Sequence, residues 1–211
     1  MVVYADGHYI VFYSDRTGSG QIWRMDKDGD NPTQLTYNLV EGSIGGFSPD
    51  GKWVVYSKKG AEKGVWKVPV GGGNPVHLTD AEADYPTVSP DGKLIAYSYN
   101  DPSANPPERF TNPPRGIAVM ASAGSPPKKL FRIQNLTSFR WVADGRSLLY
   151  TKNEGGIDNF WNQPIAGGVP KQITHFNNQE IDSFDLSSDG KWLVMSRGTV
   201  RQDVVLIRDL R

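Results

Sequence analysis

The chain has 211 residues, which is enough for one domain of fair size with a buried core. Its 23 basic and 23 acidic residues cancel and form no basic patch, so composition argues against a nucleic-acid-binding protein. The absence of cysteine excludes disulfides, thiolate metal sites and cysteine nucleophiles. No apolar run reaches the ~18 residues that a membrane-spanning helix needs, and the first residues are not expected to form a signal peptide.

An Asp-Gly pair recurs along the chain and is usually followed by Lys and a run of apolar residues. The glycines of these pairs lie 44, 41, 53 and 45 residues apart, at Gly7, Gly51, Gly92, Gly145 and Gly190. A period of about 40–45 residues is typical of four-stranded propeller blades. The sequence therefore predicts one domain, 1–211, with five tandem repeats at approximately 1–38, 39–79, 80–131, 132–175 and 176–211.

Each repeat is expected to contain strands in the same order. In the second repeat a short strand ends at Phe47, the turn Ser48-Pro49-Asp50-Gly51 follows, and Trp53–Tyr56 forms the next strand. Because the apolar residues of such runs do not alternate with polar ones, we expect these strands to be buried on both faces, between neighbouring blades. The corresponding runs are Ile10–Tyr13, Leu94–Tyr97, Leu148–Tyr150 and Trp192–Met195.

A third strand with a tryptophan at an equivalent position follows in three repeats, at Trp23, Trp66 and Trp161. These rings could stack sugars or bases, but packing between blades is the favoured interpretation. A glycine-containing hairpin then leads to a fourth strand. The fourth strands are predicted at Gln34–Thr36, His77–Thr79, Lys129–Phe131 and Gln172–Thr174. The last repeat is predicted to have only three strands, the third at Val204–Ile207, and no helix is predicted.

The stretches from Tyr13 to Gly18 and from Ile22 to Thr36, with the Ser-Pro-Asp-Gly-Lys motif, resemble the TolB-like, WD-repeat-like propeller repeat. The resemblance covers essentially the whole chain. It implies an all-β propeller of four-stranded antiparallel blades around a central channel. TolB-like rings more often have six or seven blades, so these five are expected to be part of a larger ring. The resemblance also implies a bacterial protein and favours a periplasmic or other extracytoplasmic location over the cytoplasm.

The sequence shows no recognisable catalytic motif. In the repeated Asp-Gly pairs we expect Asp to hold the turn through its side chain and Gly to take the left-handed conformation. A calcium loop beginning at Asp26 would need a bidentate Glu where the chain has Tyr37. The three histidines share no ligand spacing, and no Gly-x-Ser-x-Gly elbow occurs. We therefore predict no catalytic residue, no metal and no cofactor.

One loop breaks the repeat. It runs from Asn100 to Gly116 and contains five prolines. Long loops within compact domains are often functional, and Arg and aromatic side chains dominate binding hot spots. The corresponding loops of neighbouring repeats are expected on the same face. The predicted binding residues are Asp15, Arg16, Arg109, Phe110, Arg115 and Asp158.

Because propellers host binding and catalysis alike, the function stays open between three hypotheses. The favoured one is a non-catalytic protein-interaction or ligand-sensing module of a larger bacterial protein. It would bind a protein or peptide, or a small ligand at the channel mouth, without nucleic-acid binding or membrane insertion. The alternatives are a propeller that gates a prolyl-oligopeptidase-type hydrolase domain outside this sequence, and a lyase or glycosidase with its site in the channel. The incomplete last repeat also predicts self-association through the terminal blades.

Overall fold

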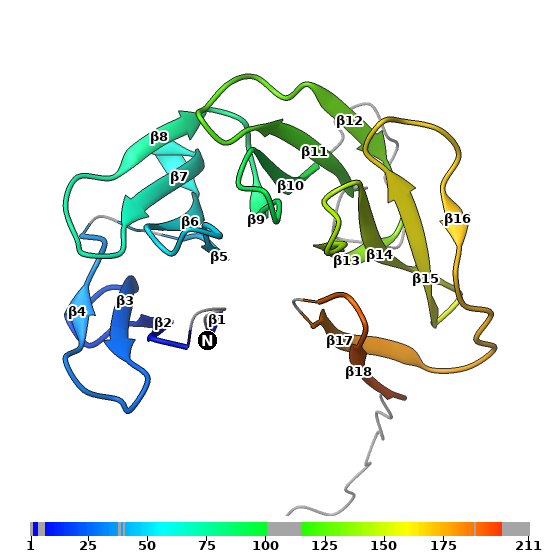
Figure 1. Cartoon of the computed structure of the whole chain (residues 1–211), viewed down its shortest axis with the longest axis horizontal. Helices are drawn as coiled ribbons and strands as arrows, with labels where there is room; N and C mark the ends of the chain where they lie inside the picture. Colours follow the sequence, from blue (N-terminus) through cyan, green and yellow to red (C-terminus); the bar gives the residue numbers. More distant parts are fainter. Residues whose placement is uncertain are drawn as a thin grey trace, which may run out of the picture.

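The strands form four four-stranded sheets and one two-stranded sheet (Figure 1). The computed structural model describes residues 2–3, 7–37, 39, 41–100, 115–187 and 189–199. Every strand pairing within these ranges is antiparallel. The only helical element in the described ranges is a 3-10 turn at Gly60–Glu62. The predicted all-β class is confirmed.

Each sheet consists of strands that follow one another in the sequence. The first sheet contains β1 (Val2–Val3), β2 (Tyr9–Ser14), β3 (Gln21–Asp26) and β4 (Thr33–Gln34). The second contains β5 (Ile44–Phe47), β6 (Trp53–Lys58), β7 (Gly64–Pro69) and β8 (Val76–Thr79). The third contains β9 (Asp84–Val88), β10 (Leu94–Asn100), β11 (Arg115–Ala121) and β12 (Lys129–Arg132). The fourth contains β13 (Leu136–Trp141), β14 (Ser147–Glu154), β15 (Ile157–Pro164) and β16 (Lys171–Gln172), and the last contains β17 (Glu180–Leu186) and β18 (Leu193–Gly198).

The sheets follow one another around an arc (Figure 1). Strands β5, β9, β13 and β17 lie on its inner side, and the fourth strands β4, β8, β12 and β16 lie on its outer side. Among the described residues, the most extensive contacts between sheets join successive sheets: β2 with β5, both β5 and β6 with β9, β9 with β13, and both β13 and β15 with β17. This arrangement of radial antiparallel sheets is that of a β-propeller.

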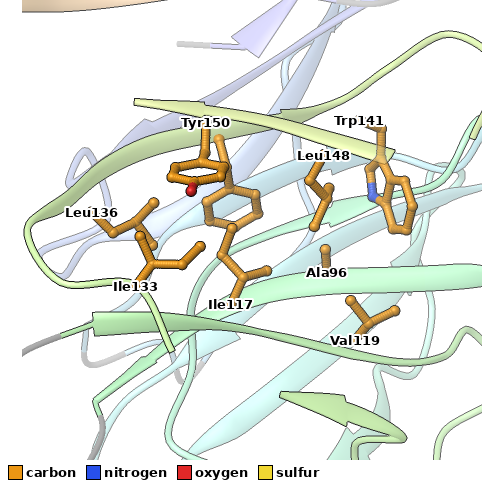
Figure 2. Packing of buried hydrophobic residues seen from close by; sticks show 9 residues of the cluster. Ala96, Ile117, Val119, Ile133, Leu136, Trp141, Leu148 and Tyr150 are labelled. Carbon is orange, nitrogen blue, oxygen red and sulfur yellow. The ribbon is translucent and has the colours of Figure 1, made fainter. Parts of the chain in front are cut away.

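The hydrophobic core is divided into clusters that lie between successive sheets. Figure 2 shows the cluster between the third and fourth sheets, where Ile117 and Val119 of β11 face Trp141, Leu148 and Tyr150. Three further clusters occupy the other junctions between neighbouring sheets. Burial on both faces explains why the second strands are continuous apolar runs rather than alternating ones.

The last of these runs departs from that expectation. Trp192 and Val194 are 70% and 72% exposed, whereas Val54 and Val55 of β6 are 0% and 2% exposed. The physical reason is that no further strand or sheet covers β18 among the residues that the structure describes. Val204–Ile207, the predicted third strand of the last repeat, lies outside the described residues.

The Asp-Gly turns have the predicted construction. The glycines adopt the left-handed conformation, with φ of 68° at Gly51 and 74° at Gly92. The Oδ1 atom of Asp50 accepts a hydrogen bond from the backbone N–H of Lys52 at 3.2 Å, and Asp91 accepts one from Lys93 at 3.0 Å. The same bond recurs at the turns of Asp144 and Asp189. The Asp-Gly pairs therefore fix the hairpins that join the first two strands of each of these sheets.

Candidate functional site

The predicted binding residues are not all brought together. Asp15 and Arg16 are exposed in the turn after β2. The guanidinium of Arg16 lies 4.8 Å from the ring centroid of Trp23 and 5.1 Å from that of Phe12, so it packs on its own sheet. Arg109 and Phe110 lie outside the described residues.

The long loop between the second and third strands of the third sheet is shorter than the sequence predicts. Asn100 pairs with Arg115, and Tyr99 pairs with Gly116, so these residues extend β10 and β11. A Cβ atom at Gly116 would lie 2.5 Å from the carbonyl oxygen of Phe131, which explains the glycine there. The segment between the two strands is therefore 101–114, and it lies outside the described residues.

The prediction that Asp158 lies on an exposed polar rim is wrong. Its side chain lies within β15 and is only 2% exposed. The Oδ2 atom accepts a hydrogen bond from the backbone N–H of Ile181 at 2.8 Å, which ties β15 to β17. The carboxylate thus joins the fourth and fifth sheets and is not accessible to a partner. Sequence spacing places it in the loop between the second and third strands of its repeat and does not reveal what covers it.

The hydrogen bonds that recur in the turns also account for their carboxylates without a ligand. Hydrogen bonds from the hydroxyl of Ser48 and the N–H of Lys52 hold the pKa of Asp50 below its usual value. The pKa values of Asp91 and Asp189 are lowered in the same way, by Ser89 and Ser187 first. The role of these three carboxylates is to hold the turns in which they lie.

This arrangement predicts a pH dependence of stability. A pKa that is lower in the folded chain stabilises it above the unfolded value of about 3.8, and this stabilisation is lost as the pH falls through the folded pKa. We expect the triple variant Asp50→Asn, Asp91→Asn, Asp189→Asn, which keeps an acceptor in each turn, to lose less thermal stability than the parent between pH 5 and 2.5. Thermal midpoints measured across this range provide the test, and parallel curves would contradict the explanation.

The equivalent tryptophans have a structural role. Trp66 packs against the core between the first and second sheets, and Trp161 against the core between the third and fourth. A basic side chain from the end of the second strand covers each ring: the Lys58 ammonium is 5.4 Å from the centroid of Trp66, and that of Lys152 is 4.2 Å from Trp161. His77 stacks on Trp66 with centroids 4.3 Å apart. Packing between blades, the favoured interpretation, is confirmed for these two rings.

The inner strands carry polar residues that sequence reasoning did not select. On β9, Tyr85 is 56% exposed and adopts a positive φ of 50°. The side chains of Arg140 on β13 and Asp185 on β17 are 42% and 79% exposed, with Nε and Oδ1 3.6 Å apart. These residues could have been found from their place in the repeat. Each lies in the strand before an Asp-containing turn, and this first strand of the repeat is the inner strand of its sheet.

In the part of the chain that the structure describes, grooves open between neighbouring sheets. One, of about 500 Å³, lies between the second and third sheets and is lined by Asp50, Trp53, Lys67, Val88, Asp91 and Ile95 among others. The other, of about 250 Å³, lies between the first and second sheets and is bordered by Tyr37, Tyr56, Trp66 and the Lys58–Glu62 ion pair. Both contain aromatic and charged side chains.

Within the described ranges, no three His, Asp or Glu side chains gather in a way that could hold a metal ion. The described part of the chain likewise contains no helix with the length and apolar character needed to cross a membrane.

The antiparallel sheets arranged around an arc define the chain as a β-propeller protein. The family model of the TolB beta propeller domain matches residues 2–106, about half of the chain. The chain is therefore a TolB-like β-propeller, as the resemblance of its repeats predicts.

A curated relative is similar to a large part of the chain. An uncharacterized protein of Agrobacterium fabrum is 26% identical over 155 residues, which make up 70% of this chain and 52% of that protein. The chain thus spans about half the length of this curated relative.

Solved structures share the fold. A putative TolB from Agrobacterium tumefaciens superposes with a TM-score of 0.68 at 17% identity, over 94% of this chain and 73% of that one. TolB from Acinetobacter baumannii superposes with a TM-score of 0.66 at 19% identity, over 92% of this chain and 48% of that one. A puromycin-hydrolyzing peptidase of Mycobacterium tuberculosis gives 0.63 at 19% identity, over 93% of this chain and only 34% of the peptidase.

Proposed function

We propose that the chain is a non-catalytic protein-interaction module of a larger bacterial protein. The observation that carries this proposal is the set of inner strands. In the described part of the chain, β5, β9, β13 and β17 each pair on one side only. Their other edges present backbone N–H and C=O groups along the inner side of the arc (Figure 1). Such edges suit an extended peptide, whose backbone can form the missing hydrogen bonds.

Side chains on the inner strands support the same proposal. Arg140 and Asp185 form a partly exposed pair on neighbouring inner strands, and Tyr85 adds an exposed ring. The Arg140 guanidinium also lies 5.5 Å from the ring centroid of Phe184, which holds it beside the core. Arginine and aromatic side chains are enriched in the surfaces with which proteins bind one another.

The non-catalytic part of the proposal rests on how the acids are engaged. Asp50, Asp91 and Asp189 accept hydrogen bonds within their own turns, and Asp158 accepts one from a strand of the next sheet. Carboxylates committed to local structure are poorly placed for acid–base work on a substrate.

The face that carries the loops between second and third strands is the second proposed contact surface, with Asp15, Arg16 and the segment 101–114. Because Asn100 and Arg115 pair, a short Gly-Ser turn can join them without disturbing β10 and β11. We expect a variant with 101–114 replaced in this way to keep the thermal midpoint of the parent within about 2 °C. It should lose most of the binding to the partner.

The test uses the immobilised parent chain and this variant with extracts of the source bacterium, followed by calorimetry with the purified partner. A partner bound equally by the loop variant and by a variant with Arg140→Ala and Asp185→Ala would contradict both proposed surfaces. Turnover of a hydrolase substrate by the pure chain, lost when one carboxylate is replaced, would contradict the non-catalytic role. The TolB-like repeats favour a periplasmic or other extracytoplasmic location, which cell fractionation would check.

Self-association through the terminal blades is part of the proposal. Trp192, directly before β18, and Val194 within it expose large apolar side chains, and exposed apolar patches beside a strand edge favour association. We expect the parent chain to be larger than a monomer at micromolar concentrations in light scattering. The variant Trp192→Thr, Val194→Thr, which keeps strand-forming residues, should be monomeric. The control Val76→Thr on β8 should behave as the parent, and a monomeric parent would contradict this prediction.

A further inference from the structure

Strand β18 has a free edge in the part of the chain that the structure describes. The sheet of β17 and β18 has two strands, whereas each of the other sheets has four. In those sheets the second strand pairs on both sides, with the first and with the third strand. Strand β18 is the second strand of its sheet and pairs with β17 only.

Hydrogen bonds at the start of β18 show which backbone groups lie at this free edge. The carbonyl oxygen of Trp192 accepts a hydrogen bond from the N–H of Ser187 at 2.9 Å, and the N–H of Trp192 donates one to the Ser187 hydroxyl at 2.9 Å. Trp192 thus directs its backbone groups toward the first strand of the sheet. Because this direction alternates along an antiparallel strand, the N–H and C=O groups of Leu193, Met195 and Arg197 lie at the free edge.

The side chains of β18 also lack a neighbouring strand. Met195 lies opposite Phe184 of β17, so it faces the core between the fourth and fifth sheets, yet it is 38% exposed. Its counterpart in the fourth sheet, Tyr150, is 2% exposed and lies opposite Trp161 of the third strand. Leu193, two residues before Met195, is 37% exposed. A strand beside β18 would cover Leu193 and Met195 as the third strand does in the fourth sheet.

The free edge of β18 is poorly protected against pairing. Sheets usually protect exposed edges with very short strands, charged residues or bulges. Among the outer strands, β4 and β16 have two residues each, and β12 carries Lys129 and Arg132. Strand β18 has six residues and one charge, at Arg197, and the bulge of its pairing lies in β17. The edge is therefore long and apolar enough to accept another strand.

We propose that β18 pairs with β18 of a second copy of this chain, antiparallel and about a two-fold axis. The inference rests on the self-association included in the proposed function, and it assigns the strand and the symmetry of that contact. Strands β17 and β18 of the two copies then form one four-stranded sheet, the strand number of the other sheets. A contact of this kind uses the same edge on both copies, so it closes at the dimer.

The two-fold axis restricts the register, because one residue must lie opposite its own copy. An axis at Val194 would place Lys191 opposite Arg197 of the second copy, and like charges directly opposite each other are destabilising. An axis at Met195 places Leu193 opposite Arg197 of the second copy and Val194 opposite Ser196. We therefore expect the register in which Met195 pairs with Met195 of the second copy.

Single introduced cysteines test this register, since the chain has none of its own. In Met195→Cys the two thiols would lie on directly opposite residues with Cα atoms about 5.5 Å apart, which a disulfide can bridge. The matched control is Lys191→Cys, whose own copy would lie roughly 26 Å away along the paired strands. After mild oxidation at micromolar concentration, we expect at least about tenfold more disulfide-linked dimer with Met195→Cys. Val76→Cys, on the exposed β8, measures dimer formed by random collision.

A proline variant tests the backbone pairing itself. Because the N–H of Met195 lies at the free edge, Met195→Pro removes a donor that the pairing with β17 does not use. We expect this variant to be monomeric in light scattering, whereas Met195→Val, which keeps the N–H and suits a strand, should associate as the parent does. The cysteine variants still give a result if Met195→Pro does not fold.

The outcomes separate this inference from the proposed function. If the parent associates but Met195→Cys gives no more disulfide-linked dimer than Lys191→Cys, the pairing of β18 is refuted and self-association stands. A monomeric parent refutes both. A monomeric parent whose Leu193 and Met195 amides are protected from hydrogen exchange would show that β18 finds its partner within one chain. Binding of a captured partner at the inner-strand and loop surfaces is measured separately, so its loss would refute the interaction module and not the pairing of β18.

Discussion

Replacing Phe160 by Ala is expected to lower the free energy of unfolding by about 3–5 kcal/mol, the usual range for deleting a buried ring. Phe160 is 0% exposed, and its ring meets that of Phe184 edge-on with centroids 4.9 Å apart. It belongs to the cluster that joins the fourth and fifth sheets. The cavity created by the change therefore lies in the contact that holds the last sheet to the rest of the arc.

Urea unfolding of the parent and of Phe160→Ala measures this loss. The matched control is Tyr37→Ala, because Tyr37 is 72% exposed and its removal should cost less than about 0.5 kcal/mol. A cost below about 1 kcal/mol for Phe160→Ala would show that the junction between these sheets does not contribute to stability in the way the structure indicates.

Gly45→Ala is expected to be strongly destabilising, at about 2–3 kcal/mol or more. A Cβ atom at this position of β5 would lie 1.8 Å from the carbonyl oxygen of Pro86 and 2.7 Å from its carbonyl carbon. These are backbone atoms of β9, so the inner strands of two successive sheets would have to separate. Gly71→Ala is the control, since nothing lies within 4 Å of its Cβ position and its φ is not left-handed. Thermal unfolding of both variants tests the prediction, and equal midpoints would contradict the close approach of β5 and β9.

The elements that the sequence predicts well are those specified by local chemistry. The Asp-Gly turns require a left-handed glycine and a side-chain acceptor, so each turn can be located from two residues and gives the repeat its period. The apolar runs after the turns identify the second strands. Trp66 and Trp161 identify the third strands, 15 and 16 residues after the turn glycines Gly51 and Gly145. These features need no knowledge of what lies beside each sheet.

The features that the sequence does not reveal depend on the neighbouring sheet. Asp158 lies in a segment whose composition is typical of an exposed loop. Only the position of Ile181, across the junction between the fourth and fifth sheets, shows that its carboxylate is buried. The run Trp192–Met195 has the same pattern as Trp53–Tyr56, yet it is exposed because burial requires a covering sheet.

Hydrogen–deuterium exchange of the chain with and without its captured partner tests most directly the claim that this propeller binds a polypeptide. Amide groups at the open edges of β5, β9, β13 and β17 exchange with solvent in the free chain and would become hydrogen-bonded on binding. The predicted result is protection in these strands and in the loops that follow β2, β10 and β14. Protection confined to the outer strands β4, β8, β12 and β16, with the inner strands unchanged, would contradict this claim.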